Sequence, residues 1–78
     1  MRWLPEIRQI MSTVMAVPPD GIQPGTVPND VAAWDSVTHL YLVIALEDEL
    51  DIRLSPGEIE RMTSVGEICG IVAEKRGA

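Results

Sequence analysis

Asp35 and Ser36 precede a segment of helical periodicity, Val37 to Leu50, which leads into the acidic run Glu47-Asp48-Glu49-Leu50-Asp51. Asp is a preferred N-cap residue, because its carboxylate accepts hydrogen bonds from the free amides of the first helical turn. Ser36 then takes the first helical position, with its hydroxyl facing solvent near the positive end of the helix dipole, where a phosphodiester is electrostatically favoured. This arrangement fits a serine that is modified through phosphate rather than one that catalyses. The simpler interpretation is a plain helix cap, so the rest of the chain has to decide.

Few other side chains could serve in catalysis or in metal binding. His39 is the only histidine, and a helical wheel places it beside Leu42 and Leu46, so we expect a packed or half-exposed imidazole rather than a base. Cys69 falls on the inner face of the last predicted helix and is expected to be a small core residue. One His and one Cys do not form a zinc site with the carboxylates as they are spaced. We therefore expect no catalytic residue, no metal site and a protein that is not an enzyme.

The charge of the chain points to protein partners. The 78 residues carry a formal net charge of −6, and no Lys or Arg lies between Arg8 and Arg53. Such a surface repels nucleic acids and anionic lipids and complements basic protein patches.

The length predicts one domain, residues 1–78, which we expect to be a monomer. No apolar run suggests a signal peptide or a membrane span. Cys69, as the only cysteine, leaves no internal disulfide, so the expected location is the reducing cytoplasm.

Periodicity and helix caps divide the chain into four helices. Apolar residues at three-and-four spacing predict a helix over 4–16, followed by a long loop to Ala33 that Val27 and Val31 anchor to the core. Ser55-Pro56-Gly57-Glu58 has capping-box spacing and predicts a short helix ending near Arg61, and Ser64-Val65-Gly66-Glu67 repeats the box before the last helix. No strand pattern competes. The predicted fold is all-α, a small four-helix bundle with three longer helices and one short one.

A helical wheel at about 100° per residue gives the helix after Ser36 two apolar sides. One side, expected to be core, holds Leu42, Val43, Leu46 and Leu50. The other holds Val37, Leu40, Tyr41 and Ile44, together with Glu47, Asp48 and Asp51. An apolar strip fringed by carboxylates is typical of a protein-docking surface, and a helix buried on nearly all sides is the alternative.

These features together resemble the acyl carrier proteins. Asp35-Ser36-Val37 is similar to their Asp-Ser-Leu signature, and Leu42 to Asp51 resembles the second helix that follows it. Ser55 to Glu60 is similar to their short third helix, and Thr63 to Ile68 to the start of their fourth. The resemblance covers essentially the whole chain.

The resemblance implies that Ser36 carries 4′-phosphopantetheine, with Asp35 beside it as the second cofactor-binding residue. A phosphopantetheinyl transferase takes this group from coenzyme A. The thiol of this arm then holds an acyl or aminoacyl group as a thioester. Other implied partners are acyl-activating or acyl-transferring enzymes with basic docking patches, and catalysis belongs to them.

Three residues differ from the pattern of fatty acid carriers. Val37 replaces the usual Leu, Trp34 replaces a small residue, and Tyr41 stands where an acid is common. Trp before Asp-Ser is similar to stand-alone carriers of specialised metabolism or aminoacyl transfer, although Trp34 could also be a packing plug for the long loop. The sequence thus favours an acyl carrier outside housekeeping lipid synthesis. An aminoacyl or peptidyl carrier and an unmodified helical adaptor remain as alternatives.

Overall fold

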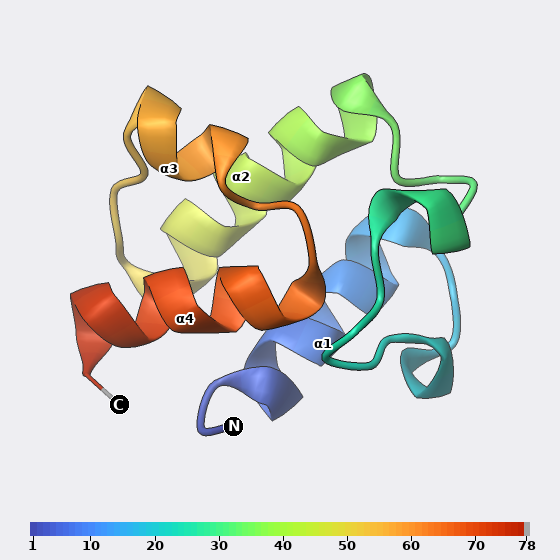
Figure 1. The fold of residues 1–78 in the computed structure, drawn as a ribbon, viewed down its shortest axis with the longest axis horizontal. Helices are drawn as coiled ribbons and strands as arrows, with labels where there is room; N and C mark the ends of the chain where they lie inside the picture. The colour runs from blue at the N-terminus through green and yellow to red at the C-terminus, as the bar shows by residue number, and fades with distance from the viewer. Residues whose placement is uncertain (78) are drawn as a thin grey trace.

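The computed structural model describes residues 1–77, which form α1 (Leu4–Met15), α2 (Ser36–Leu50), α3 (Pro56–Glu60) and α4 (Val65–Arg76) (Figure 1). Two short 3₁₀ turns, η1 (Pro19–Gly21) and η2 (Pro28–Asp30), lie in the segment between α1 and α2. The described residues contain no strand. Helix α1 packs against α2 and α4, and the short α3 lies beside α2 (Figure 1). The predicted all-α bundle of three longer helices and one short helix is confirmed.

Serine side chains start the last two helices. The Ser55 hydroxyl accepts a hydrogen bond from the Glu58 amide at 3.2 Å, and the Glu58 carboxylate accepts one from the Ser55 amide at 2.9 Å. This reciprocal capping box confirms the predicted start of α3. At α4 the Ser64 hydroxyl accepts from the Glu67 amide at 3.1 Å, which is the serine half of the second predicted box.

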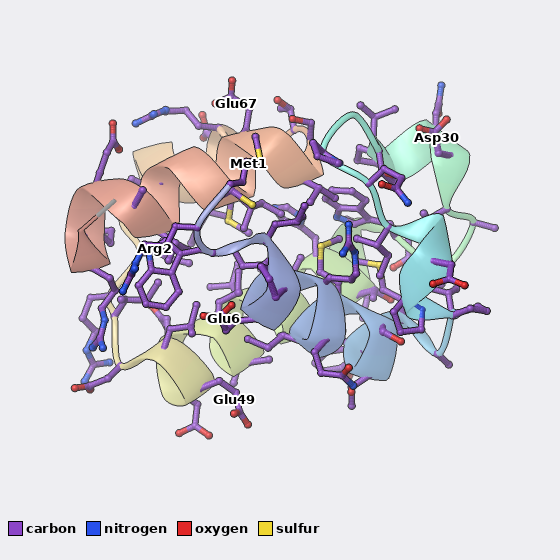
Figure 2. The ribbon with its side chains drawn as sticks, turned by 90° about the horizontal axis from the view of Figure 1, so that it is seen from below. Met1, Arg2, Glu6, Asp30, Glu49 and Glu67 are labelled. Carbon is purple, nitrogen blue, oxygen red and sulfur yellow. The ribbon has the colours of Figure 1, made fainter. Side chains whose placement is uncertain are left out.

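The core is formed mainly by the inner faces of the three longer helices, and residues of the connecting segments complete it. Side chains at most 1 % exposed are Ile7, Met11, Ile22, Leu42, Leu46, Val65, Ile68, Ile71 and Val72. The acidic side chains labelled in Figure 2 (Glu6, Asp30, Glu49 and Glu67) all lie at the surface. Apolar burial therefore accounts for the packing of the bundle, and these four acidic side chains are left in water.

The long segment between α1 and α2 is held down differently from the prediction. Val31 is buried as expected, but Val27 is only half-buried. The main anchor is Ile22, which is fully buried, and whose carbonyl oxygen accepts a hydrogen bond from Arg8 Nε at 2.9 Å. Sequence analysis missed Ile22 because an isolated apolar residue in a Pro- and Gly-rich loop has no periodicity.

The same segment is also tied to the start of α4. The Val65 amide donates to the Thr26 carbonyl at 3.0 Å, and the Gly66 amide donates to the Pro24 carbonyl at 2.8 Å. These bonds satisfy two of the amides that a helix start leaves free. They also fix the end of the loop that leads to Ser36.

Candidate functional site

Ser36 is the first residue of α2, and its side chain is exposed. Asp35 caps the helix, because its Oδ1 accepts a hydrogen bond from the Thr38 amide at 2.8 Å. This amide lowers the pKa of the Asp35 carboxyl group, which is therefore ionised at neutral pH. The predicted cap and the exposed hydroxyl beside it are both present.

The other three serines use their hydroxyls within the fold. Ser12 Oγ donates to the Val17 carbonyl, and the hydroxyls of Ser55 and Ser64 accept from helix amides. Within residues 1–77, no such bond engages the Ser36 hydroxyl. Ser36 is thus the serine whose hydroxyl an external group can reach and replace without loss of a structural hydrogen bond.

Helix α2 has the two sides that the wheel predicts. Its core side is buried: Leu42, Val43, Leu46 and Leu50. The opposite side, here called the α2 strip, consists of Val37, Leu40, Tyr41 and Ile44, which are 57–62 % exposed. Apart from Met1, these four are the large apolar side chains that the described chain leaves in solvent. An exposed apolar strip beginning next to Ser36 has the character of a docking surface.

The acids near the end of α2 are not equivalent. Asp48 and Asp51 are exposed, whereas Glu47 is half-buried. Glu47 Oε2 accepts a hydrogen bond from the Leu54 amide at 3.0 Å, so this carboxylate braces the connection to α3. Only Asp48 and Asp51 of the three predicted partner-binding acids are without such a bond within residues 1–77.

A largely apolar groove of about 470 Å³ opens beside Ser36. Ser36 and Asp35 border it, and its other lining residues include Pro28, Trp34, His39, Leu40, Ile59 and Met62. Trp34 and Met62 are buried, so they form the floor. Binding pockets for small organic groups span about 300–1,000 Å³ and are mostly apolar, so this groove has the size and character for one.

His39 bridges three parts of the groove wall. Its Nδ1 accepts a hydrogen bond from Trp34 Nε1 at 2.9 Å, and its Nε2 lies 3.2 Å from the carbonyl oxygen of Ile59. An indole N–H can only donate, so Nδ1 is unprotonated and Nε2 carries the proton that it donates to Ile59. The expectation of a half-buried, packed imidazole is confirmed, and Trp34 is the packing plug considered above. Sequence analysis missed the bridge itself, because the carbonyl partner lies 20 residues away.

The remaining candidates for chemistry are inert. Cys69 is buried, and loss of solvation raises the pKa of its thiol. No group of three or more His, Cys, Asp or Glu side chains within residues 1–77 is arranged to hold a metal ion. In the same part of the chain, no helix has the length and apolar character needed to cross a membrane.

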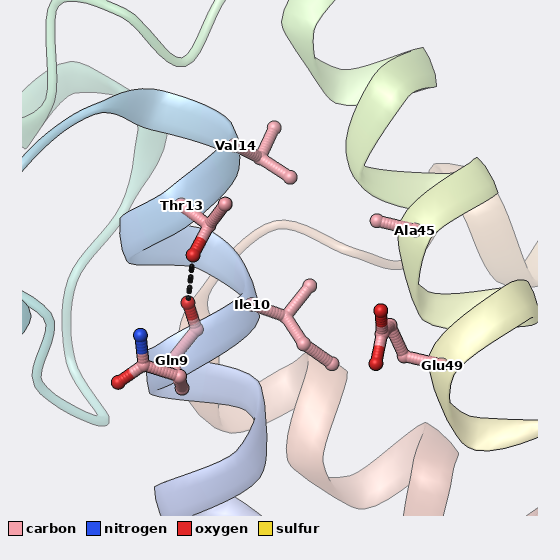
Figure 3. A pocket seen from close by; sticks show the side chains of 6 residues that line it. All are labelled: Gln9, Ile10, Thr13, Val14, Ala45 and Glu49. Atoms are coloured by element: carbon pink, nitrogen blue, oxygen red, sulfur yellow. Dashed lines mark hydrogen bonds between the residues drawn. The ribbon is translucent and has the colours of Figure 1, made fainter.

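A second hollow lies between α1 and α2, away from the groove (Figure 3). Ile10 and Val14 of α1 face Ala45 and Glu49 of α2 across it, and the Thr13 hydroxyl donates to the Gln9 carbonyl at its edge. The Thr13 hydroxyl is engaged with the Gln9 carbonyl, and Glu49 is the one acidic side chain within residues 1–77 that lines this space. It is a packing seam of the bundle.

Comparison with known proteins identifies the family of this chain. Residues 5–72 match the family described as "Phosphopantetheine attachment site". An acyl carrier protein of Picosynechococcus sp. is 36 % identical over 74 residues, which cover 94 % of this chain and 90 % of that protein. The solution structure of a holo acyl carrier protein from Geobacter metallireducens superposes with a TM-score of 0.87 at 29 % identity, covering 96 % of this chain and 86 % of that one.

The fold and the site thus define a phosphopantetheine-bearing carrier protein. More particularly, the chain belongs to the acyl carrier protein family. It is a carrier and not a catalyst, its covalent cofactor is 4′-phosphopantetheine, and its partners are a phosphopantetheinyl transferase and acyl-handling enzymes. The cofactor supplies a thiol on a flexible arm, which holds an acyl group as a thioester. An exposed serine at a capped helix start fits such a group, because nothing has to unfold to reach its hydroxyl.

Proposed function

We propose that Ser36 is the attachment site of the phosphopantetheine arm. The observation that carries this proposal is the free, exposed hydroxyl at the first position of α2, between the groove and the α2 strip. In the loading step Ser36 Oγ forms a phosphodiester with the pantetheine phosphate of coenzyme A. The pyrophosphate bond breaks, adenosine 3′,5′-bisphosphate leaves, and the serine proton passes to the transferase or to water.

Asp35 supports this step by fixing the helix start rather than by holding the phosphate. Its carboxylate already accepts the Thr38 amide, and a second negative group placed against it would be repelled. Asp35 and Ser36 are both exposed. Water and salt therefore screen the repulsion between the Asp35 carboxylate and a phosphodiester on Ser36.

The test is enzymatic loading followed by intact mass measurement. A broad-specificity phosphopantetheinyl transferase with coenzyme A should add one phosphopantetheine to the wild type and none to Ser36→Ala. Ser64→Ala is the matched control, because it removes another serine hydroxyl at a helix start and should still be loaded. A wild type without a mass increase would support the alternative of an unmodified helical adaptor.

We also propose that the α2 strip, with Asp48 and Asp51 beside it, docks the partner enzymes through their basic patches. The strip is apolar and exposed next to Ser36, and the acids lie at the other end of the same helix. Apolar contacts supply affinity, and complementary charges raise the rate of encounter. Glu47 contributes charge to this end of the helix but is also needed for its bond to Leu54.

Charge variants test the docking role without disturbing the fold. Asp48→Asn with Asp51→Asn should slow Ser36 loading and weaken its salt dependence, since exposed charges are screened over about 8 Å at physiological ionic strength. Asn is suitable at position 51, because Asp51 has a left-handed backbone with φ 53° that Asn tolerates. Arg53 is exposed and borders the hollow that Asp48 and Asp51 line, so Arg53→Gln should act in the opposite direction. Equal loading rates in all of these variants would refute electrostatic docking.

For the cargo, we propose an acyl group of a specialised biosynthetic route rather than of housekeeping lipid synthesis. Tyr41 supports this proposal, because it places an aromatic side chain, 61 % exposed, in the α2 strip where fatty acid carriers often present an acid. The aminoacyl or peptidyl carrier is distinguished by the mass of the group released from the thioester of protein isolated from its native host.

A further inference from the structure

The groove beside Ser36 ends at a closed floor. Trp34 and Met62, which form it, are 4 % and 2 % exposed and belong to the same core cluster as Leu42 and Leu46. Those two leucines are fully buried. A group attached near Ser36 can therefore lie in the groove, but it meets packed side chains when it is directed between α2 and α3.

The floor is held by hydrogen bonds as well as by packing. Trp34 belongs to the loop, His39 to α2 and Ile59 to α3, and the imidazole joins all three through the two bonds described above. The indole and imidazole planes lie nearly parallel, at 16° with centroids 6.2 Å apart. His39 thus fixes the position of Trp34 relative to both helices.

Displacing the floor would break this set of bonds. If an alkyl chain pushed Trp34 aside, the hydrogen bond between the indole N–H and His39 Nδ1 would break, at a place where Trp34 is buried and His39 is half-buried. Buried polar groups without partners are strongly unfavourable. The two bonds therefore oppose entry of a long chain more than apolar packing alone would.

We propose that His39 is a positioning residue that holds Trp34 as the floor of the groove, and that this floor lets the protein shelter only short or compact acyl groups. The cargo then lies along the groove instead of entering the helical core. This inference rests on the proposed attachment of the arm at Ser36, and it names the class of cargo that the protein can shelter on that arm.

The test compares cargo lengths on the complete chain. The transferase loads the wild type from coenzyme A, acetyl-coenzyme A or tetradecanoyl-coenzyme A, intact mass confirms each product, and thermal unfolding is followed by circular dichroism. The wild type should show no gain in midpoint from the acetyl to the tetradecanoyl form. In His39→Leu, which keeps an apolar side chain but loses both bonds, Trp34 can move, and the tetradecanoyl form should melt several degrees above the acetyl form.

Two controls separate positioning from simple loss of structure. His39→Gln retains an acceptor and a donor and should restore the wild-type result. The emission of Trp34, measured in a Trp3→Phe background, should be independent of cargo length in the wild type and should shift with the tetradecanoyl group in His39→Leu.

A wild type whose midpoint or Trp34 emission responds to the long chain overturns the proposal, even if the His39 variants do not fold. The proposal is equally overturned if His39→Leu folds and behaves like the wild type. Failure of Ser36 to gain any mass is a different result, since it refutes the attachment site itself.

Discussion

Truncation of Leu46 to alanine tests the assignment of the two sides of α2 on which the docking proposal depends. Leu46 is fully buried and contributes to the single core, whereas Ile44, two residues earlier on the same helix, is 62 % exposed. Loss of a buried leucine side chain costs about 2–5 kcal/mol, from the lost transfer free energy and the cavity that remains. A chain of 78 residues has a total stability of about 4–12 kcal/mol, at about 0.05–0.15 kcal/mol per residue. Leu46→Ala should therefore remove a large part of the stability or all of it.

Ile44→Ala is the matched variant, because it makes a similar truncation in the same helix. Most of the Ile44 side chain is already in water, and alanine has the higher helix propensity, so its free energy of unfolding should change by at most about 0.5 kcal/mol. Urea unfolding followed by circular dichroism measures both variants. With a slope near the lower end of the usual range of about 1–3 kcal/mol/M, the Leu46→Ala midpoint falls by about 2 M or more.

Ser36 loading by the transferase is measured on the same two proteins. Ile44→Ala should be loaded more slowly than the wild type while it stays folded, because a central apolar contact of the interface is lost. If Ile44→Ala unfolds and Leu46→Ala does not, the two sides of α2 have been assigned the wrong way round. If Ile44→Ala is loaded at the wild-type rate, the strip has no part in transferase docking.

Further predictions concern the fold that positions Ser36. Gly70→Ala should raise stability by about 0.5–1 kcal/mol through helix propensity, because a Cβ there meets nothing within 4 Å. Gly66→Ala should be less stable than Gly70→Ala by about 1 kcal/mol or more in urea unfolding. The reason is that its Cβ would lie 3.1 Å from the Pro24 carbonyl oxygen, to which the amide of residue 66 donates. Equal effects at both glycines would show that the loop moves away without cost. The pKa of the Glu58 carboxyl is lowered from 4.5, mainly by the hydrogen bond from the Ser55 amide. The second cause is Lys75, whose Nζ lies 2.9 Å from Glu58 Oε1. The stabilising contribution of the Glu58 carboxylate is therefore present above about pH 4.5 and is lost as the pH falls through the lower, folded-state pKa, so Glu58→Gln should lose less stability on acidification than the wild type.

Local signals in the sequence were sufficient for the helix starts and for the two sides of α2. Asp35 and Ser55 cap their helices through contacts within three residues, and such contacts are encoded by short-range spacing. The buried and exposed sides of α2 follow from helical geometry once one side is known to face the core. The proposed role of Ser36 came from the family resemblance, because a cap motif alone does not specify it.

Contacts between distant segments could not be predicted in the same way. Three roles depend on where separate segments of the chain meet. They are the burial of Ile22 in the core, the bond of Glu47 to the Leu54 amide and the bond of His39 to the Ile59 carbonyl. Periodicity carries no information about such pairs. Glu47 is an example. The helical wheel places it on the same side of α2 as Asp48 and Asp51, but its carboxylate accepts a hydrogen bond within the fold.

The same long-range contacts explain how a small bundle can keep Ser36, the proposed attachment serine, both exposed and fixed. Ser36 makes no structural bond through its hydroxyl within residues 1–77, yet the residues around it are tied to three elements. Asp35 fixes the first turn of α2, His39 joins that turn to α3, and the bonds from Val65 and Gly66 hold the preceding loop on α4. Modification of the hydroxyl breaks none of these bonds. With the arm attached at Ser36 as proposed, the helix start would present it to successive enzymes without breaking any of these bonds.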